Sequence, residues 1–228
     1  MDTEKGIIND NVKLLQSLFE RNSNMENSYH MEKYMRNQFK FLGIKTPKRK
    51  ELMRSFFRET AILKRPLQSD FILALWYLDV REYQYAALDY IERSLKKLET
   101  KHLSLIAELI TTKSWWDTVD PLATKSVGKI ANDNPDVIRD VIDNWAQSNN
   151  MWLNRTAILF QLKYKEKTDE DLLYRYINYH SNSKEFFVQK AIGWALREYS
   201  KTNPESVKHF IESNTLAKLS VREGSKYI

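Results

Sequence analysis

The sequence predicts an all-α protein, an α-solenoid made of stacked helix pairs. The chain has only five glycines and five prolines in 228 residues. Average usage of these two residues is about 12% and would give more than twice that number, so an all-β fold with many turns is disfavoured. Aromatic-led segments also recur at intervals of about 32–37 residues, which is a period typical of helical repeats.

The first 60 residues predict three helices. An apolar stripe at helical spacing indicates a helix over residues 2–23; its members are Ile7, Ile8, Val12, Leu15, Leu18 and Phe19. A second helix is expected over residues 29–35. Residues 39–47 form a loop, and Thr46 as N-cap with Pro47 at N1 opens the third helix.

From Ser69 onward the predicted helices follow one another with few breaks. Ser69 caps a helix that ends near Asp79. The further helices are expected over residues 83–95, 101–111, 120–131, 135–148, 151–163, 169–179, 185–199, 204–212 and 215–222. No linker is long enough to separate two domains, so residues 1–228 are expected to form a single domain.

Three segments, at residues 83–88, 152–158 and 187–192, resemble one another, and the Trp115–Trp116 pair falls between the first two. Their spacing predicts helix pairs stacked as repeats, with alternate helices on one concave wall. An ordinary helical domain with accidental spacing is the alternative. The residues expected on the wall are Tyr83, Tyr85, Trp116, Trp152, Arg155, Phe187, Lys190 and Trp194.

Composition restricts the possible functions. The net charge of +6 and the pI near 9.2 favour a polyanionic partner such as nucleic acid. The absence of cysteine excludes disulfides, Cys-ligated metals and a Cys nucleophile. The four histidines are scattered without i,i+4 pairing, so we expect no metal site. The longest apolar run, residues 71–78, cannot cross a bilayer, and the polar N-terminus does not resemble a signal peptide. We therefore expect a soluble cytoplasmic protein.

The segment Ser-Trp-Trp-Asp-Thr-Val-Asp-Pro at residues 114–121 is the most informative in the chain. Adjacent tryptophans point in different directions, so at least one is expected on a surface or in a cleft. In a helix, Trp116 and Asp120 would share a face. The acids can also be explained as caps, because Ser114 with Asp117 resembles a capping box and Asp120 before Pro121 resembles an N-cap.

Several basic residues are candidates for binding an anion. Arg155 occupies the first turn of its predicted helix, where a cation opposes the helix dipole and suggests an external anion; a solvated surface arginine is the alternative. Arg197 could share a face with Trp194, although a tryptophan between small residues is more often part of a core. Lys163, near a helix end, needs no ligand to explain it. Residues 45–54 carry a basic cluster, which is usually a solvated face.

Four segments together resemble the AlkD-type DNA alkylation repair glycosylases. They are residues 34–47, 114–120, 154–157 and 191–199, and the resemblance extends from about Tyr34 to Tyr199. It implies a curved α-solenoid of HEAT-like antiparallel helix pairs. It also implies a monofunctional enzyme of base excision repair that removes N3- and N7-alkylated purines from double-stranded DNA, with no cofactor or metal, and we expect a monomer.

The resemblance assigns roles by matching position. Asp120, Trp116 and Trp194 would form the catalytic face. The DNA contacts would be Arg155, Lys163, Arg197, Lys45 and Thr46. The chemistry suits these residues, because an alkylated purine is cationic and departs neutral, which leaves positive charge on the sugar that a fixed carboxylate could stabilise. The alternative function is a non-catalytic solenoid that binds DNA structure or a protein partner.

Overall fold

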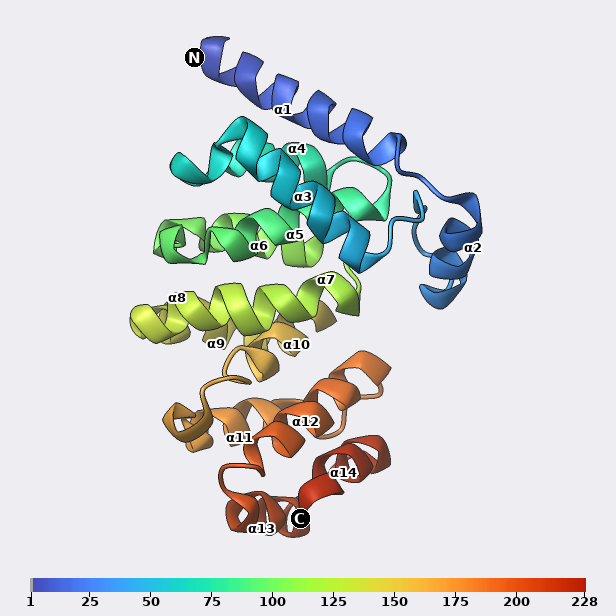
Figure 1. Cartoon of the computed structure of the whole chain (residues 1–228). Coiled ribbons are helices and arrows are strands. Elements are labelled where there is room, and N and C mark those ends of the chain that lie inside the picture. Colours follow the sequence, from blue (N-terminus) through green and yellow to red (C-terminus); the bar gives the residue numbers. More distant parts are fainter. Residues whose placement is uncertain (1) are drawn as a thin grey trace. The chain divides into compact units, whose positions relative to one another are not determined.

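The computed structural model describes residues 2–228, and its regular elements are helices, which confirms the all-α prediction (Figure 1). Within this range the only β pairing is an isolated bridge between Lys40 and Val80. The chain divides into two compact units, the first ending at Lys97 and the second beginning at Leu98. The curved shape and the single domain expected for the whole chain stay predictions. No helix among residues 2–228 has the length and apolar character to cross a membrane.

The first unit is built around an aromatic core. Its α-helices are α1 (Asp2–Glu20), α2 (Met25–Tyr34), α3 (Thr46–Thr60), α4 (Ser69–Trp76) and α5 (Arg81–Arg93). The Phe71 ring stacks on Phe56 at a centroid distance of 5.8 Å and meets the edge of Tyr90 at 5.4 Å. Because all three rings are fully buried, they hold α3, α4 and α5 together.

Two helix starts in this unit differ from the predictions. Helix α2 begins at Met25, earlier than predicted, because the Asn24 side chain accepts a hydrogen bond from the Asn27 amide at 2.9 Å. The prediction that Thr46 caps α3 is wrong. Lys45 is the N-cap residue, Thr46 is the first helical residue, and no side chain caps this end. The first turn of α3 contains no acidic residue, and Lys45 and Lys48 lie at the start of the helix.

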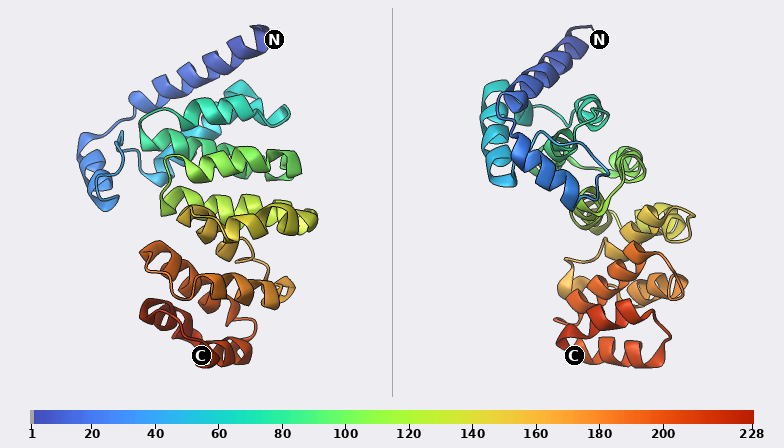
Figure 2. Two further views of the ribbon diagram at one scale, coloured as in Figure 1. Left: turned by 180° about the vertical axis from the view of Figure 1, so that it is seen from behind. Right: turned by 90° about the vertical axis from the view of Figure 1, so that its right-hand side faces the viewer.

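The second unit is a stack of helices from Leu98 to Ile228. Its α-helices are α6 (Leu103–Thr111), α7 (Trp116–Pro121), α8 (Gly128–Asp133), α9 (Asp143–Ala146), α10 (Met151–Leu159), α11 (Glu170–Tyr179), α12 (Phe186–Tyr199), α13 (Pro204–Ser213) and α14 (Lys218–Gly224). A π-helical segment, Leu122–Val127, joins α7 to α8. Helix α12 packs on both α10 and α14 (Figure 2).

A recurring side-chain amide supports the repeat predicted from the sequence. Gln84, Asn154 and Gln189 each donate a hydrogen bond to the carbonyl six residues earlier, at 2.7, 2.8 and 2.8 Å. Asn154 and Gln189 are one predicted period apart, and Gln84 precedes Asn154 by two periods. Each amide thereby satisfies carbonyls in the turn that leads into its own helix, so the same local device recurs along the chain.

Candidate functional site

Asp120 lies inside α7 and does not cap it. The helix begins at Trp116 and contains Pro121, while Trp115 is the N-cap residue and makes no side-chain cap. The hydroxyl of Ser114 donates to the Ile110 carbonyl at 2.6 Å. The capping-box and N-cap explanations of this segment are therefore wrong, and the carboxylate of Asp120 is available for a tertiary contact.

That contact is a two-point ion pair with Arg155 of α10. Arg155 Nε lies 2.7 Å from Asp120 Oδ1, and Nη2 lies 2.9 Å from Oδ2. The two side chains are only 5% and 14% exposed. The third guanidinium nitrogen, Nη1, donates to the carbonyl of Phe187 in the first turn of α12. One buried guanidinium thus links α7, α10 and α12 and fixes the orientation of the Asp120 carboxylate.

Burial and the ion pair act on Asp120 in opposite directions. Removal of the carboxylate from water raises the pKa of Asp120 above its ordinary value, and the nearby Asp117 adds to the rise. The hydrogen bonds and positive charge of Arg155 oppose both effects. The ionised form of Asp120 therefore depends on Arg155, since little water reaches the carboxylate.

Each of the tandem tryptophans, Trp115 and Trp116, is half-buried. The Trp115 ring lies 5.0 Å from the Phe187 ring and 6.1 Å from the Trp152 ring, measured between centroids. This aromatic cluster packs α7 against α10 and α12. Trp116 is half-buried and lies one helical turn before Asp120. The expectation that Tyr83 and Trp152 line an open wall is wrong, because both side chains are buried.

Helix α12 presents a second candidate tryptophan beside basic residues. Phe187, Lys190, Trp194 and Arg197 follow one another at intervals of three, four and three residues, so they share one face of the helix. Trp194 is half-buried. Among the candidate site residues, Asp120 and Arg155 are in direct contact. Trp116 lies on the same helix as Asp120, and Trp194 lies on α12, the helix whose Phe187 carbonyl accepts a hydrogen bond from Arg155.

The predicted DNA contacts occupy different environments. Lys163 is 61% exposed and lies 3.6 Å from the carboxylate of Glu198. Arg197 is less exposed and forms an ion pair with Glu223 at 3.1 Å. Arg155 is buried and held by Asp120, a geometry that does not favour a contact with a DNA phosphate. Lys45 and Thr46 are exposed at the start of α3 in the first unit.

Sequence reasoning missed two buried glutamates. Glu82 accepts hydrogen bonds from the Leu42, Gly43 and Ile44 amides at 2.8–3.0 Å and so fixes the loop that leads to Lys45. Burial raises the pKa of Glu82, and these amides oppose the rise. Glu223 binds basic side chains of α12. Neither glutamate belongs to a local motif, because each acts on residues distant in sequence.

The candidate site does not coincide with a cavity of the second unit. A cavity of about 280 Å³ lies between α10, α11 and α12, with Leu162, Glu198 and Lys201 in its lining. Asp120, Arg155 and the two candidate tryptophans do not line it. Among residues 5–228, whose side chains the structure describes, no group of three His, Asp or Glu residues is placed to hold a metal ion.

Comparison with known proteins places this chain in a repair family. The family model described as DNA alkylation repair enzyme matches residues 15–228. A solved structure described as a predicted DNA alkylation repair enzyme from Enterococcus faecalis is 34% identical, with 90% of this chain and 96% of that chain covered and a TM-score of 0.80. Among curated proteins, none gives a significant match.

A more distant structure supports the fold alone. AlkD2 from Streptococcus mutans is 19% identical, with 70% of this chain and 80% of that chain covered and a TM-score of 0.56. The family match covers both compact units and every candidate site residue. The family match over residues 15–228 and the 34% identity to the Enterococcus faecalis structure show that this chain belongs to the DNA alkylation repair enzyme family.

Proposed function

We propose that the chain is a monofunctional DNA glycosylase that hydrolyses the N-glycosidic bond of N3- and N7-alkylated purines in double-stranded DNA. The observation that carries this proposal is the Asp120 carboxylate, buried and held at two points by Arg155, on the same helix as the half-buried Trp116. A fixed carboxylate in a weakly hydrated site suits a reaction that develops positive charge.

The leaving group explains why one carboxylate is sufficient. A purine alkylated at N3 or N7 carries a positive charge and departs as a neutral base, so no general acid has to protonate it. The positive charge moves to the deoxyribose, which becomes oxocarbenium-like. Asp120 stabilises this charge and accepts a proton from the attacking water as the new C–O bond forms. Removal of one such preorganised partner typically costs about 10²–10³ in rate.

The other site residues assist this step. Arg155 is a positioning residue, because it orients Asp120 and keeps it ionised. Trp116 and Trp194 offer aromatic faces to the cationic base or sugar, a contact worth about 0.5–2 kcal/mol. Lys163, Arg197, Lys45 and Thr46 contact the DNA backbone and supply a salt-dependent affinity. The reaction needs water and no cofactor, and the protein acts as a monomer in the cytoplasm.

Release of 7-methylguanine and 3-methyladenine from methylated duplex DNA tests the activity. We expect release of both bases at a rate well above spontaneous depurination, with abasic sites left in an otherwise intact strand. Cleavage of the strand in the absence of added alkali would contradict a monofunctional enzyme. Tight, salt-sensitive binding of the duplex without release of either base would favour the non-catalytic solenoid.

A further inference from the structure

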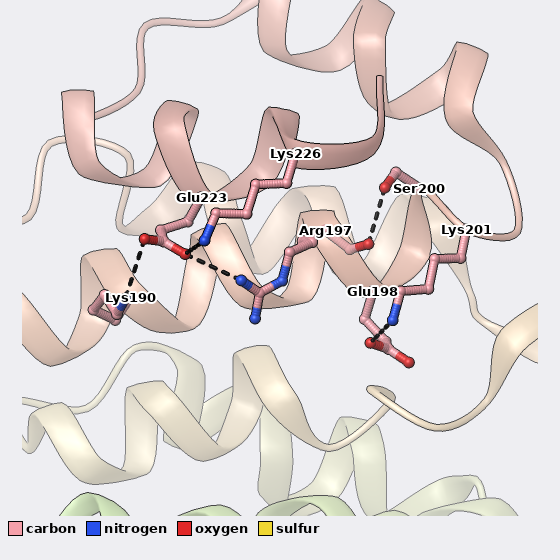
Figure 3. A network of polar contacts seen from close by, with 7 residues as sticks. All are labelled: Lys190, Arg197, Glu198, Ser200, Lys201, Glu223 and Lys226. Carbon is pink, nitrogen blue, oxygen red and sulfur yellow. Dashed lines mark hydrogen bonds and ion pairs between the residues drawn. The ribbon is translucent and has the colours of Figure 1, made fainter.

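One carboxylate near the C-terminus gathers three basic side chains (Figure 3). Glu223 of α14 has Oε1 3.3 Å from Lys190 Nζ, and its Oε2 lies 3.1 Å from Arg197 Nη1 and 2.8 Å from Lys226 Nζ. The Glu223 side chain is only 11% exposed, whereas the three cations are 26–47% exposed. The carboxylate is therefore inside the cluster and the positive charges face solvent.

Two cations of the cluster flank the candidate tryptophan along α12. Lys190 is four residues before Trp194 and Arg197 is three residues after it, so both cations lie on the tryptophan's side of the helix. Gly193 makes this arrangement possible. A Cβ added there would lie 2.5 Å from the Cβ of Glu223, so any larger residue would push α14 away from α12.

The charges of the cluster do not cancel. Three cations against one carboxylate leave two positive charges in excess. Arg197 reaches Glu223 through Nη1, and a guanidinium has five N–H donors, so Arg197 can bind the carboxylate and a second anion together. One cation would be enough to neutralise the Glu223 carboxylate. The two additional positive charges are suited to binding the negative charge of a phosphodiester.

We propose that Glu223 is a positioning residue that holds Lys190 and Arg197 on either side of Trp194, where the two cations bind a backbone phosphate of duplex DNA. This inference rests on the proposed function, because it places a phosphate next to the nucleotide whose glycosidic bond is cleaved. It assigns a role to α14, whose sequence contains no recognisable motif. Lys226 completes the cluster and offsets the charge of Glu223.

The sign of one substitution distinguishes positioning from simple neutralisation. Glu223→Gln removes a negative charge from the neighbourhood of a polyanion, so electrostatics alone predicts tighter binding of DNA. If Glu223 positions the two cations, the same change releases them and weakens binding although the protein is more positive. A loss of a correctly placed phosphate contact also lowers the slope of log K against log salt by about 1.

The test is the affinity of the full chain for an undamaged duplex, measured from about 50 to 200 mM salt. We expect Glu223→Gln to weaken binding at least threefold with a smaller salt slope. Glu212→Gln, which removes the same charge from an exposed position of α13, should bind as well as or better than wild type. Equal or tighter binding by Glu223→Gln would overturn the inference.

Two further variants keep the test decisive if Glu223→Gln does not fold. Lys190→Gln and Arg197→Gln should each lower the salt slope by about 1, and unchanged slopes in both would overturn the inference. These outcomes concern binding of undamaged DNA and leave the excision assay independent. If the wild-type protein excises alkylated purines and the Glu223→Gln variant binds DNA more tightly than wild type, the proposed function stands and this inference fails.

Discussion

Replacement of Arg155 by methionine tests whether this side chain positions Asp120. Methionine keeps most of the volume and removes the charge, so the Asp120 carboxylate would remain buried without the two bonds of 2.7 and 2.9 Å that now hold it. The carbonyl of Phe187 would also lose its guanidinium partner. The pKa of Asp120, already raised by burial, would rise further, because Arg155 is what opposes the rise.

The expected loss of stability follows from the burial of the pair. Removal of one partner from a buried ion pair typically costs about 3–5 kcal/mol, and the 14% exposure of Asp120 favours the lower end. At about 2–4 °C per kcal/mol for a chain of this size, the melting temperature should fall by about 6–12 °C. Adding Asp120→Asn should restore part of the loss, because the unpaired charge disappears.

Urea unfolding monitored by circular dichroism measures these differences. Arg139→Met is the matched control, because its side chain is 75% exposed and pairs with Asp140 at the surface; it should cost far less stability than Arg155→Met, because exposed ion pairs contribute little. A loss no larger than that of the control, or a double variant less stable than Arg155→Met, would refute the positioning role. In DNA binding, Arg155→Met should keep the wild-type salt slope, whereas a slope lower by about 1 would indicate a phosphate contact.

Three other predictions test the packing and electrostatics. Gly193→Ala should destabilise the protein by about 1–3 kcal/mol in urea unfolding because its Cβ would meet Glu223, whereas Gly6→Ala, in open space on α1, should stabilise it by about 0.5–1 kcal/mol. Asn154→Ala should cost about 1–3 kcal/mol by leaving the Trp145 and Ser148 carbonyls without its amide; wild-type stability would remove the capping role. Bonding to Lys226 lowers the pKa of Glu223 from 4.5 to about 2, so the carboxylate contributes stability above pH 4.5 that is lost as the pH falls through about 2. The stability difference between wild type and Glu223→Gln should therefore be constant above about pH 5 and shrink below it, and a difference that grows in acid would contradict this sign.

The helices were predictable because their signals are local. Few glycines and prolines, apolar stripes and a period near 35 residues are all present in the sequence, and the recurring amides of Gln84, Asn154 and Gln189 show the same period in the structure. The start of α7 was not predictable. Ser114 and Asp120 fit cap patterns, but the helix begins at Trp116, next to Trp115, which packs against Phe187 far along the chain.

The members of the site were easier to predict than their contacts. Asp120 and Arg155 were both candidate site residues. The sequence suggested an external anion as the partner of Arg155, whereas in the structure Arg155 pairs with Asp120. The two residues are one repeat apart, and stacking of successive repeats is what brings them together. Glu223 carried no signal, because its role depends on the close approach of α14 to α12 at Gly193.

The single-turnover rate of 7-methylguanine excision by Asp120→Asn, with enzyme in excess over methylated duplex, tests the central claim most directly. The amide keeps the shape of the side chain and removes the charge that would stabilise the sugar cation. We expect excision at least tenfold slower than wild type, at unchanged affinity for the duplex. Excision at the wild-type rate by a folded Asp120→Asn variant would show that Asp120 is not the catalyst.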